Sequence, residues 1–77
     1  MPTAFVLITT EIGSEVSVLE SLRKLSGVKE THAVFGVYDL VALVTADSMA
    51  ELKAMITWKI RRITKVRSTL TMIILEE

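Results

Sequence analysis

The sequence predicts one α+β domain in which four antiparallel strands and two helices alternate in the order β-α-β-β-α-β. Three observations support this fold class. The chain has only 77 residues, a length that accommodates a single small domain. Four of its segments have the β-branched, apolar composition of strands. The two remaining long segments space apolar residues every three or four positions, which is typical of helices with one buried face.

One strand, one helix and a second strand are predicted in the first part of the chain. Residues 4–10 (AFVLITT) are rich in β-branched residues, and Ser14 then stands where a helix N-cap is favourable. Gly27 supplies a C-terminal stop for this helix. Residues 28–35 (VKETHAVF) show the alternation of an edge strand. The apolar stripe of the helix comprises Val16, Leu19, Leu22 and Leu25.

A turn at residues 34–40 (VFGVYDL) joins the second strand to the third. Gly36 adopts positive φ angles at no steric cost, and the Asp39 side chain can hydrogen-bond to neighbouring backbone, so a hairpin turn is predicted. The same segment contains Tyr38, the only tyrosine of the chain. Two interpretations stay open at this point: Tyr38 and Asp39 cap the turn, or the loop binds a small polar ligand.

A third strand, a second helix and a last strand complete the chain. Residues 40–46 (LVALVTA) form the third strand, and Ser48 with Glu51 makes a capping box at the start of the helix. Basic residues between positions 59 and 65 suit the C-terminal end of that helix dipole. Residues 66–75 (VRSTLTMIIL) form the last strand. The second apolar stripe comprises Leu52, Met55, Ile56, Ile60 and Ile63.

A faint internal repeat indicates how these elements are arranged. Residues 22–31 (LRKLSGVKET) and 60–69 (IRRITKVRST) share a pattern of aliphatic, basic, turn and threonine positions. Two copies of one helix-to-strand corner fit two βαβ halves related by a pseudo-two-fold axis. We therefore expect a ferredoxin-like fold, with a four-stranded antiparallel sheet, both helices on one face and right-handed crossovers.

The predicted sheet has a second face that is unusually apolar. Strands 4–10 and 40–46 carry apolar residues on both faces, whereas an antiparallel sheet open to water normally alternates apolar with polar residues. The chain has no cysteine to staple a small domain, and 51% of its residues are hydrophobic. We expect a second subunit to cover this face, packed sheet to sheet.

Composition argues against nucleic-acid and membrane partners. Lys plus Arg and Asp plus Glu number nine each, so the formal net charge is zero, whereas nucleic-acid affinity comes largely from neutralising phosphates. The strand order matches that of the RNA recognition motif, but the third and last strands lack the aromatics that stack bases. The apolar runs are shorter than the roughly 20 residues of a membrane span. The N-terminus lacks the basic start of a secretory signal, so a cytoplasmic protein is expected.

Few residues are candidates for chemistry. His32 is the only histidine; it has neither an oriented partner for acid–base catalysis nor further ligands for a metal, so a surface histidine is predicted. The three glycines are isolated and form no phosphate loop. No catalytic residue, metal site or cofactor is therefore predicted. Thr69 and Thr71 lie on one face of the last strand, where they form a simple threonine ladder or present two hydroxyls to a ligand.

Taken together, these residues resemble the RAM domain, the effector-binding domain of the Lrp/AsnC family of transcription regulators. The resemblance covers nearly the whole chain. It rests on Gly36-x-Tyr38-Asp39 before an apolar strand, on residues 66–71 (VRSTLT), and on the Gly27-Val pair after the first helix. Each motif is short, and their order and spacing together make the resemblance fairly specific.

The resemblance implies an assembly and a site. RAM domains of the family pair through their sheets, and the dimers form rings, typically of four, which makes an octamer the expected assembly. Amino acids bind between dimers, near the glycine-tyrosine-aspartate loop and the threonine-bearing strand. Asp39 would meet the α-ammonium group or a basic side chain of the ligand. By this likeness the ligand-binding residues are Gly36, Tyr38, Asp39, Thr69 and Thr71.

The expected function is that of an amino-acid-binding, oligomerising regulatory domain, without enzymatic activity, that acts in amino-acid metabolism and transcription. No helix-turn-helix precedes the first strand, so residues 1–77 are expected to form a stand-alone RAM-like domain. One departure from the family is Lys65, where glycine is frequent. Two alternatives stay open: an assembly module that hetero-oligomerises with Lrp/AsnC regulators without binding a ligand, and a dimeric α/β-barrel enzyme, for which one edge histidine is a poor basis.

Overall fold

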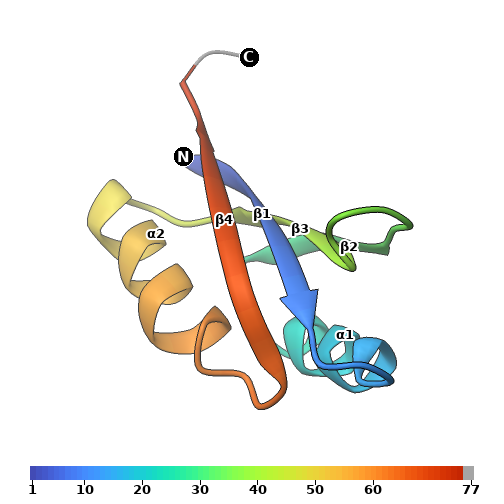
Figure 1. Ribbon diagram of the computed structural model, residues 1–77. Coiled ribbons are helices and arrows are strands. Elements are labelled where there is room, and N and C mark those ends of the chain that lie inside the picture. Colours follow the sequence, from blue (N-terminus) through green and yellow to red (C-terminus); the bar gives the residue numbers. More distant parts are fainter. Residues whose placement is uncertain (76–77) are drawn as a thin grey trace.

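The computed structural model describes residues 1–75 and has the predicted order of elements. All strands pair antiparallel in one four-stranded sheet of order β2-β3-β1-β4 (Figure 1). The ferredoxin-like fold class is therefore confirmed, and β2 is an edge strand as expected. The elements are β1 (Thr3–Thr10), α1 (Glu15–Arg23), β2 (Val28–Ala33), β3 (Leu40–Thr45), α2 (Met49–Met55), the π-helical turn η1 (Ile56–Ile60) and β4 (Val66–Ile74).

The core lies between one face of the sheet and both helices. Alternate residues of the two central strands β1 and β3 point to this face and are buried, as the period of a strand requires. Apolar residues from α1, α2 and η1 pack against them in one cluster, so both helices cover the same face. The largest fully buried side chains are Val6, Ile8, Val18, Leu22, Leu40, Val44, Leu52 and Ile60.

Helix α1 buries most of the predicted stripe, because Leu22 is fully buried and Leu19 and Leu25 pack against the core. Val16 is 69% exposed, whereas Val18, which the predicted stripe omits, is fully buried beside Leu22. Two residues correspond to about 200° around a helix, so Val16 and Val18 lie on nearly opposite sides. Ser14 stands at the N-cap position as predicted, but its side chain forms no capping hydrogen bond.

Helix α2 begins as predicted and ends in a wider turn. The Glu51 backbone N–H donates to the Ser48 hydroxyl at 3.1 Å, which is one half of the predicted capping box. Helix α2 then continues into η1, where the Arg61 N–H donates to the carbonyl oxygen of Ile56 at 3.0 Å. Of the predicted stripe, Leu52, Met55, Ile56 and Ile60 are buried and Ile63 packs against them. Across residues 1–75, no helix is long and apolar enough to span a membrane.

The internal repeat appears as two corners of similar geometry. Gly27 has a φ of +94°, and Lys65, its counterpart in the repeat, has a φ of +79°. Lysine at this position therefore adopts the left-handed conformation that glycine favours. The backbone bonds also match: the Val28 N–H donates to the Leu25 oxygen at 3.3 Å, and the Val66 N–H to the Ile63 oxygen at 3.1 Å.

Lys65 allows a direct test of the strain at the second corner. Lys65→Gly should be more stable than Lys65→Ala by about 1 kcal/mol, because only glycine adopts this φ without a Cβ clash. Both variants lose the half-exposed ion pair between Lys65 Nζ and Glu11 Oε1, which are 3.7 Å apart. The loss of this ion pair therefore does not contribute to the difference in stability between the two variants. Urea unfolding of the two variants at one protomer concentration measures the difference. Equal stabilities would show that the corner relaxes when the side chain is shortened.

The opposite face of the sheet is an apolar surface, here called the outer face. On it Leu7 lies between Val41 of β3 and Leu70 of β4, which are its register partners. Leu70 and Met72 are each 47% exposed. The prediction that β1 and β3 are apolar on both faces is confirmed, and β4 extends the same surface. The outer face comprises Phe5, Leu7, Val41, Leu43, Leu70, Met72 and Ile74.

Candidate ligand-binding site

The loop between β2 and β3 forms the predicted hairpin turn. The Val34 N–H donates to the Asp39 carbonyl oxygen at 2.9 Å and closes the loop. Gly36 has a φ of +152°, a conformation that side chains rarely adopt, and no atom lies within 4 Å of the place where a Cβ would be. Phe35 and Val37 are exposed at the tip. The loop therefore projects from the sheet with apolar side chains at its tip, and Gly36 within it adopts a backbone conformation that favours glycine (Figure 1).

Asp39 ties this loop to the end of β1. Its Oδ2 accepts a hydrogen bond of 2.8 Å from the Thr10 backbone N–H and lies 3.4 Å from the Thr10 hydroxyl. Its own N–H donates to the Ile8 carbonyl oxygen at 2.9 Å. The Asp39 carboxylate therefore anchors the loop to β1 through Oδ2 and does not cap its own turn, while Oδ1 accepts no hydrogen bond from residues 1–75. Tyr38, next to it, is half-buried.

Thr69 and Thr71 lie on the helix-facing side of β4 and line a cavity of about 360 Å³ beside α2 and η1. Their register partners on β1 are Ile8 and Val6, so the two threonines do not form a threonine ladder. Neither hydroxyl forms a hydrogen bond with another group in the described part of the chain. The other residues around the cavity are Lys53, Ile56, Thr57, Arg61 and Ile73.

One protomer does not bring the two groups of predicted residues together. Ile8 of β1 pairs with Leu40 on one side and with Thr69 on the other, and Asp39 directly precedes Leu40. Strand spacing places residues two strands apart at about 10 Å, with the buried side chain of Ile8 between them. The cavity at Thr69 and Thr71 accordingly contains no part of the loop. The five residues form two half-sites on either side of β1.

The sequence-based reasoning missed three polar residues of the cavity, namely Lys53, Thr57 and Arg61. They follow one another at four-residue spacing through α2 and η1, and they lie across the cavity from the threonines of β4. This spacing places them on one helix face, beside the buried stripe. A polar stripe of period four next to an apolar one was the signal available in the sequence, where Arg61 was assigned to the helix dipole and Lys53 and Thr57 were given no role.

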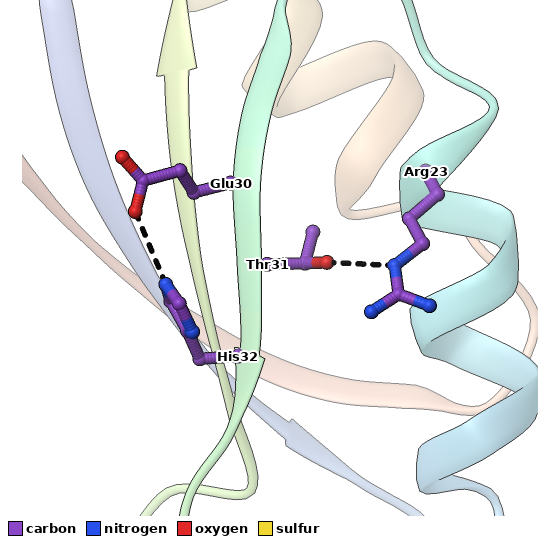
Figure 2. A network of polar contacts seen from close by, with 4 residues as sticks. All are labelled: Arg23, Glu30, Thr31 and His32. Atoms are coloured by element: carbon purple, nitrogen blue, oxygen red, sulfur yellow. Dashed lines mark hydrogen bonds and ion pairs between the residues drawn. The ribbon is translucent and has the colours of Figure 1, made fainter.

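His32 lies on the exposed edge strand, as predicted. Its Nε2 is 3.1 Å from Glu30 Oε1, and both side chains are largely exposed. Figure 2 shows these two residues on one side of β2, while Thr31 points to the other side and accepts a 3.1 Å hydrogen bond from Arg23 Nε of α1. Within residues 1–75, no three metal-ligating side chains gather in one place. The pair Glu30–His32 is a surface contact that gives no support to a catalytic role.

Comparison with protein families identifies a relationship over almost the entire chain. Residues 3–77 match the family described as the Lrp/AsnC ligand binding domain. An uncharacterized HTH-type transcriptional regulator of Pyrococcus abyssi is 35% identical over 74 residues, which cover 92% of this chain and 49% of that protein. The chain therefore spans about half the length of this relative.

Solved structures agree with the family match. The crystal structure of FFRP-DM1 is 41% identical and superposes with a TM-score of 0.94, covering 97% of this chain and all of that one. The structure of AsnC from Escherichia coli is 27% identical, with a TM-score of 0.92, and covers 99% of this chain and 52% of that one. The resemblance inferred from the short loop and strand motifs is confirmed.

Proposed function

Because this chain belongs to the family of Lrp/AsnC ligand binding domains, we propose that it binds an amino acid and that it regulates through assembly with further copies. A regulatory role agrees with relatives that are transcription regulators. The observation that carries the ligand proposal is the cavity beside β4. There Thr69 and Thr71 line the same cavity as two cationic residues, which is a suitable environment for the carboxylate of a small polar ligand.

The ligand site in this proposal is shared between two copies. One copy contributes the cavity at Thr69 and Thr71, and a neighbouring copy contributes its loop with Gly36, Tyr38 and Asp39. Two features support this arrangement. The two half-sites are about 10 Å apart in one protomer, on either side of β1. Asp39 also retains one carboxylate oxygen, Oδ1, that residues 1–75 do not use and that would accept hydrogen bonds from an ammonium group.

Pairing of the outer faces provides the first level of assembly. In a single chain this surface leaves Leu70 and Met72 about half exposed, next to Phe5, Leu7 and Leu43. Contiguous apolar surface of this kind marks an interaction site in soluble proteins. A two-fold dimer would bury the same patch on both copies. The edges and cavities of the dimer would then remain available for contacts with further dimers.

The proposed ligand residues can be tested with substitutions that spare the fold. Asp39→Asn removes the charge but keeps an acceptor for the Thr10 N–H, and Thr71→Val removes a hydroxyl at nearly constant volume. Each should weaken amino-acid binding tenfold or more, because a hydrogen bond to a charged group contributes about 1.5–3 kcal/mol. A thermal-melt screen of the amino acids identifies the ligand, and calorimetry then measures the affinities.

Glu11→Gln provides the control, since Glu11 pairs with Lys65 and lies outside both half-sites. Its affinity for the ligand should equal that of the parent chain. If Asp39→Asn and Thr71→Val also retain full affinity, the ligand site lies elsewhere. If none of the amino acids raises the melting temperature, the domain acts through assembly alone, which is the alternative derived from the sequence.

A further inference from the structure

We propose that the amino acid bound at this site has an acidic side chain, as in aspartate or glutamate. The inference rests on the function proposed above and concerns the charge of the cavity between β4 and the second helix. Sequence motifs shared with the family do not include the two residues that carry it, Lys53 and Arg61. Both line the cavity together with Thr69 and Thr71.

The cavity has two cations and no acid among its lining residues. Neither Lys53 nor Arg61 forms an ion pair within residues 1–75, where the pairs are Lys65 with Glu11 and His32 with Glu30. Arg62, the next residue along the chain, instead lies over the ring of Trp58 at 5.0 Å. The two positive charges at the cavity are therefore available to a ligand.

The helix presents these cations at the two ends of one polar stripe. Lys53 and Arg61 are eight residues apart, which corresponds to about 12 Å along a helix, and Thr57 lies midway between them. Their long side chains can converge on a small ligand from opposite ends. Thr69 and Thr71 of β4 line the same space. This geometry suits a ligand with a carboxylate at each end better than one with a single carboxylate.

The charges of the complete site also match an acidic amino acid. Two cations from one copy and Asp39 from a neighbouring copy give a net charge of +1. An acidic amino acid carries two carboxylates and one ammonium group, and hence −1. A neutral amino acid would leave one cation without a partner, and a basic one would place like charges together. The volume of about 360 Å³ lies at the small end of the range for ligand sites.

The test compares ligands that differ only in charge. We expect L-glutamate to bind at least tenfold more tightly than L-glutamine, or L-aspartate than L-asparagine, in calorimetry at fixed ionic strength. Arg61→Gln and Lys53→Gln should each weaken binding of the acidic ligand at least tenfold while changing affinity for its amide much less. Arg62→Gln removes the same charge from the neighbouring position, outside the cavity, and should leave both affinities within about twofold.

The outcomes separate this inference from the proposed function. If a neutral or basic amino acid binds more tightly than the acidic ones, the site binds amino acids but the acidic assignment is wrong. If glutarate binds as tightly as L-glutamate and the preference depends on Arg61, the cavity is a dicarboxylate site and the amino-acid proposal fails. If neither glutarate nor any of the amino acids binds, both proposals are overturned. If Arg62→Gln lowers affinity as much as Arg61→Gln, the effect reflects overall charge and the cavity assignment is wrong.

Discussion

Gly27→Ala is expected to destabilise the protein by about 3 kcal/mol or more, because the added methyl group is both overpacked and conformationally strained. A Cβ at this position would lie 2.7 Å from the Thr45 carbonyl oxygen and 3.0 Å from the Met55 sulfur. The left-handed backbone, at a φ of +94°, adds about 1–2 kcal/mol for a residue with a Cβ. The Thr45 N–H also donates to the Gly27 oxygen at 2.8 Å, so the backbone of β3 cannot move away freely.

Gly13→Ala is the matched control for this prediction. Gly13 has a similar φ of +81°, but no atom lies within 4 Å of its absent Cβ. The free energy of unfolding of this variant should fall only by the cost of the left-handed backbone conformation, about 1–2 kcal/mol. Urea unfolding at one protomer concentration measures both, because the stability of an assembly depends on concentration. Equal losses for the two variants would show that the contact with Thr45 is relieved by small shifts in the chain.

Leu7→Glu is expected to dissociate the protein into monomers at low micromolar concentration. Leu7 lies on the central strand β1, between Val41 and Leu70 on the outer face. A carboxylate buried there without a partner costs about 3–5 kcal/mol. A two-fold interface would contain this change twice, so the dimer dissociation constant should rise by about 10⁴-fold or more. Light scattering or sedimentation of parent and variant gives the mass directly.

Val16→Glu provides a control that introduces the same charge elsewhere. Val16 is an exposed valine in the first turn of α1, on the side of the molecule away from the outer face. The mass of this variant should be unchanged. A parent chain that is already a folded monomer at these concentrations would contradict the pairing of outer faces. A Leu7→Glu variant that keeps the parent mass would place the interface on another surface.

The fold could be predicted because four segments have the composition of strands and two have the apolar spacing of helices. Their order left one common arrangement with right-handed crossovers. The error in α1 has a simple cause. Val16 and Val18 are the same residue type two positions apart, and composition alone does not show which of them faces the sheet. The sheet decides this by burying Val18 with Leu22.

The candidate site was less predictable than the fold, because it depends on tertiary neighbours. The motif at Gly36, Tyr38 and Asp39 was visible, but the bond from the Thr10 N–H to Asp39 joins residues 29 apart in sequence. Likewise, Lys53 and Arg61 become relevant only when α2 and η1 lie beside β4. A local sequence pattern shows which face of a single helix or strand is apolar or polar. A cavity depends on the distance between two such elements in the folded protein, and the local pattern carries no information on that distance.

The two edge strands of the sheet differ in how readily they would pair with strands of other proteins in a newly made copy of the chain. Strand β2 is short and carries Lys29, Glu30 and His32 along its edge, a composition that discourages pairing with foreign strands. Strand β4 is longer, and its second half, from Leu70 to Ile74, has no charged residue. An uncharged edge of this length is a template for aggregation in a solitary chain. Pairing of the outer faces alone would leave this edge open, so only contacts with further copies that cover β4 would protect the protein from misassembly.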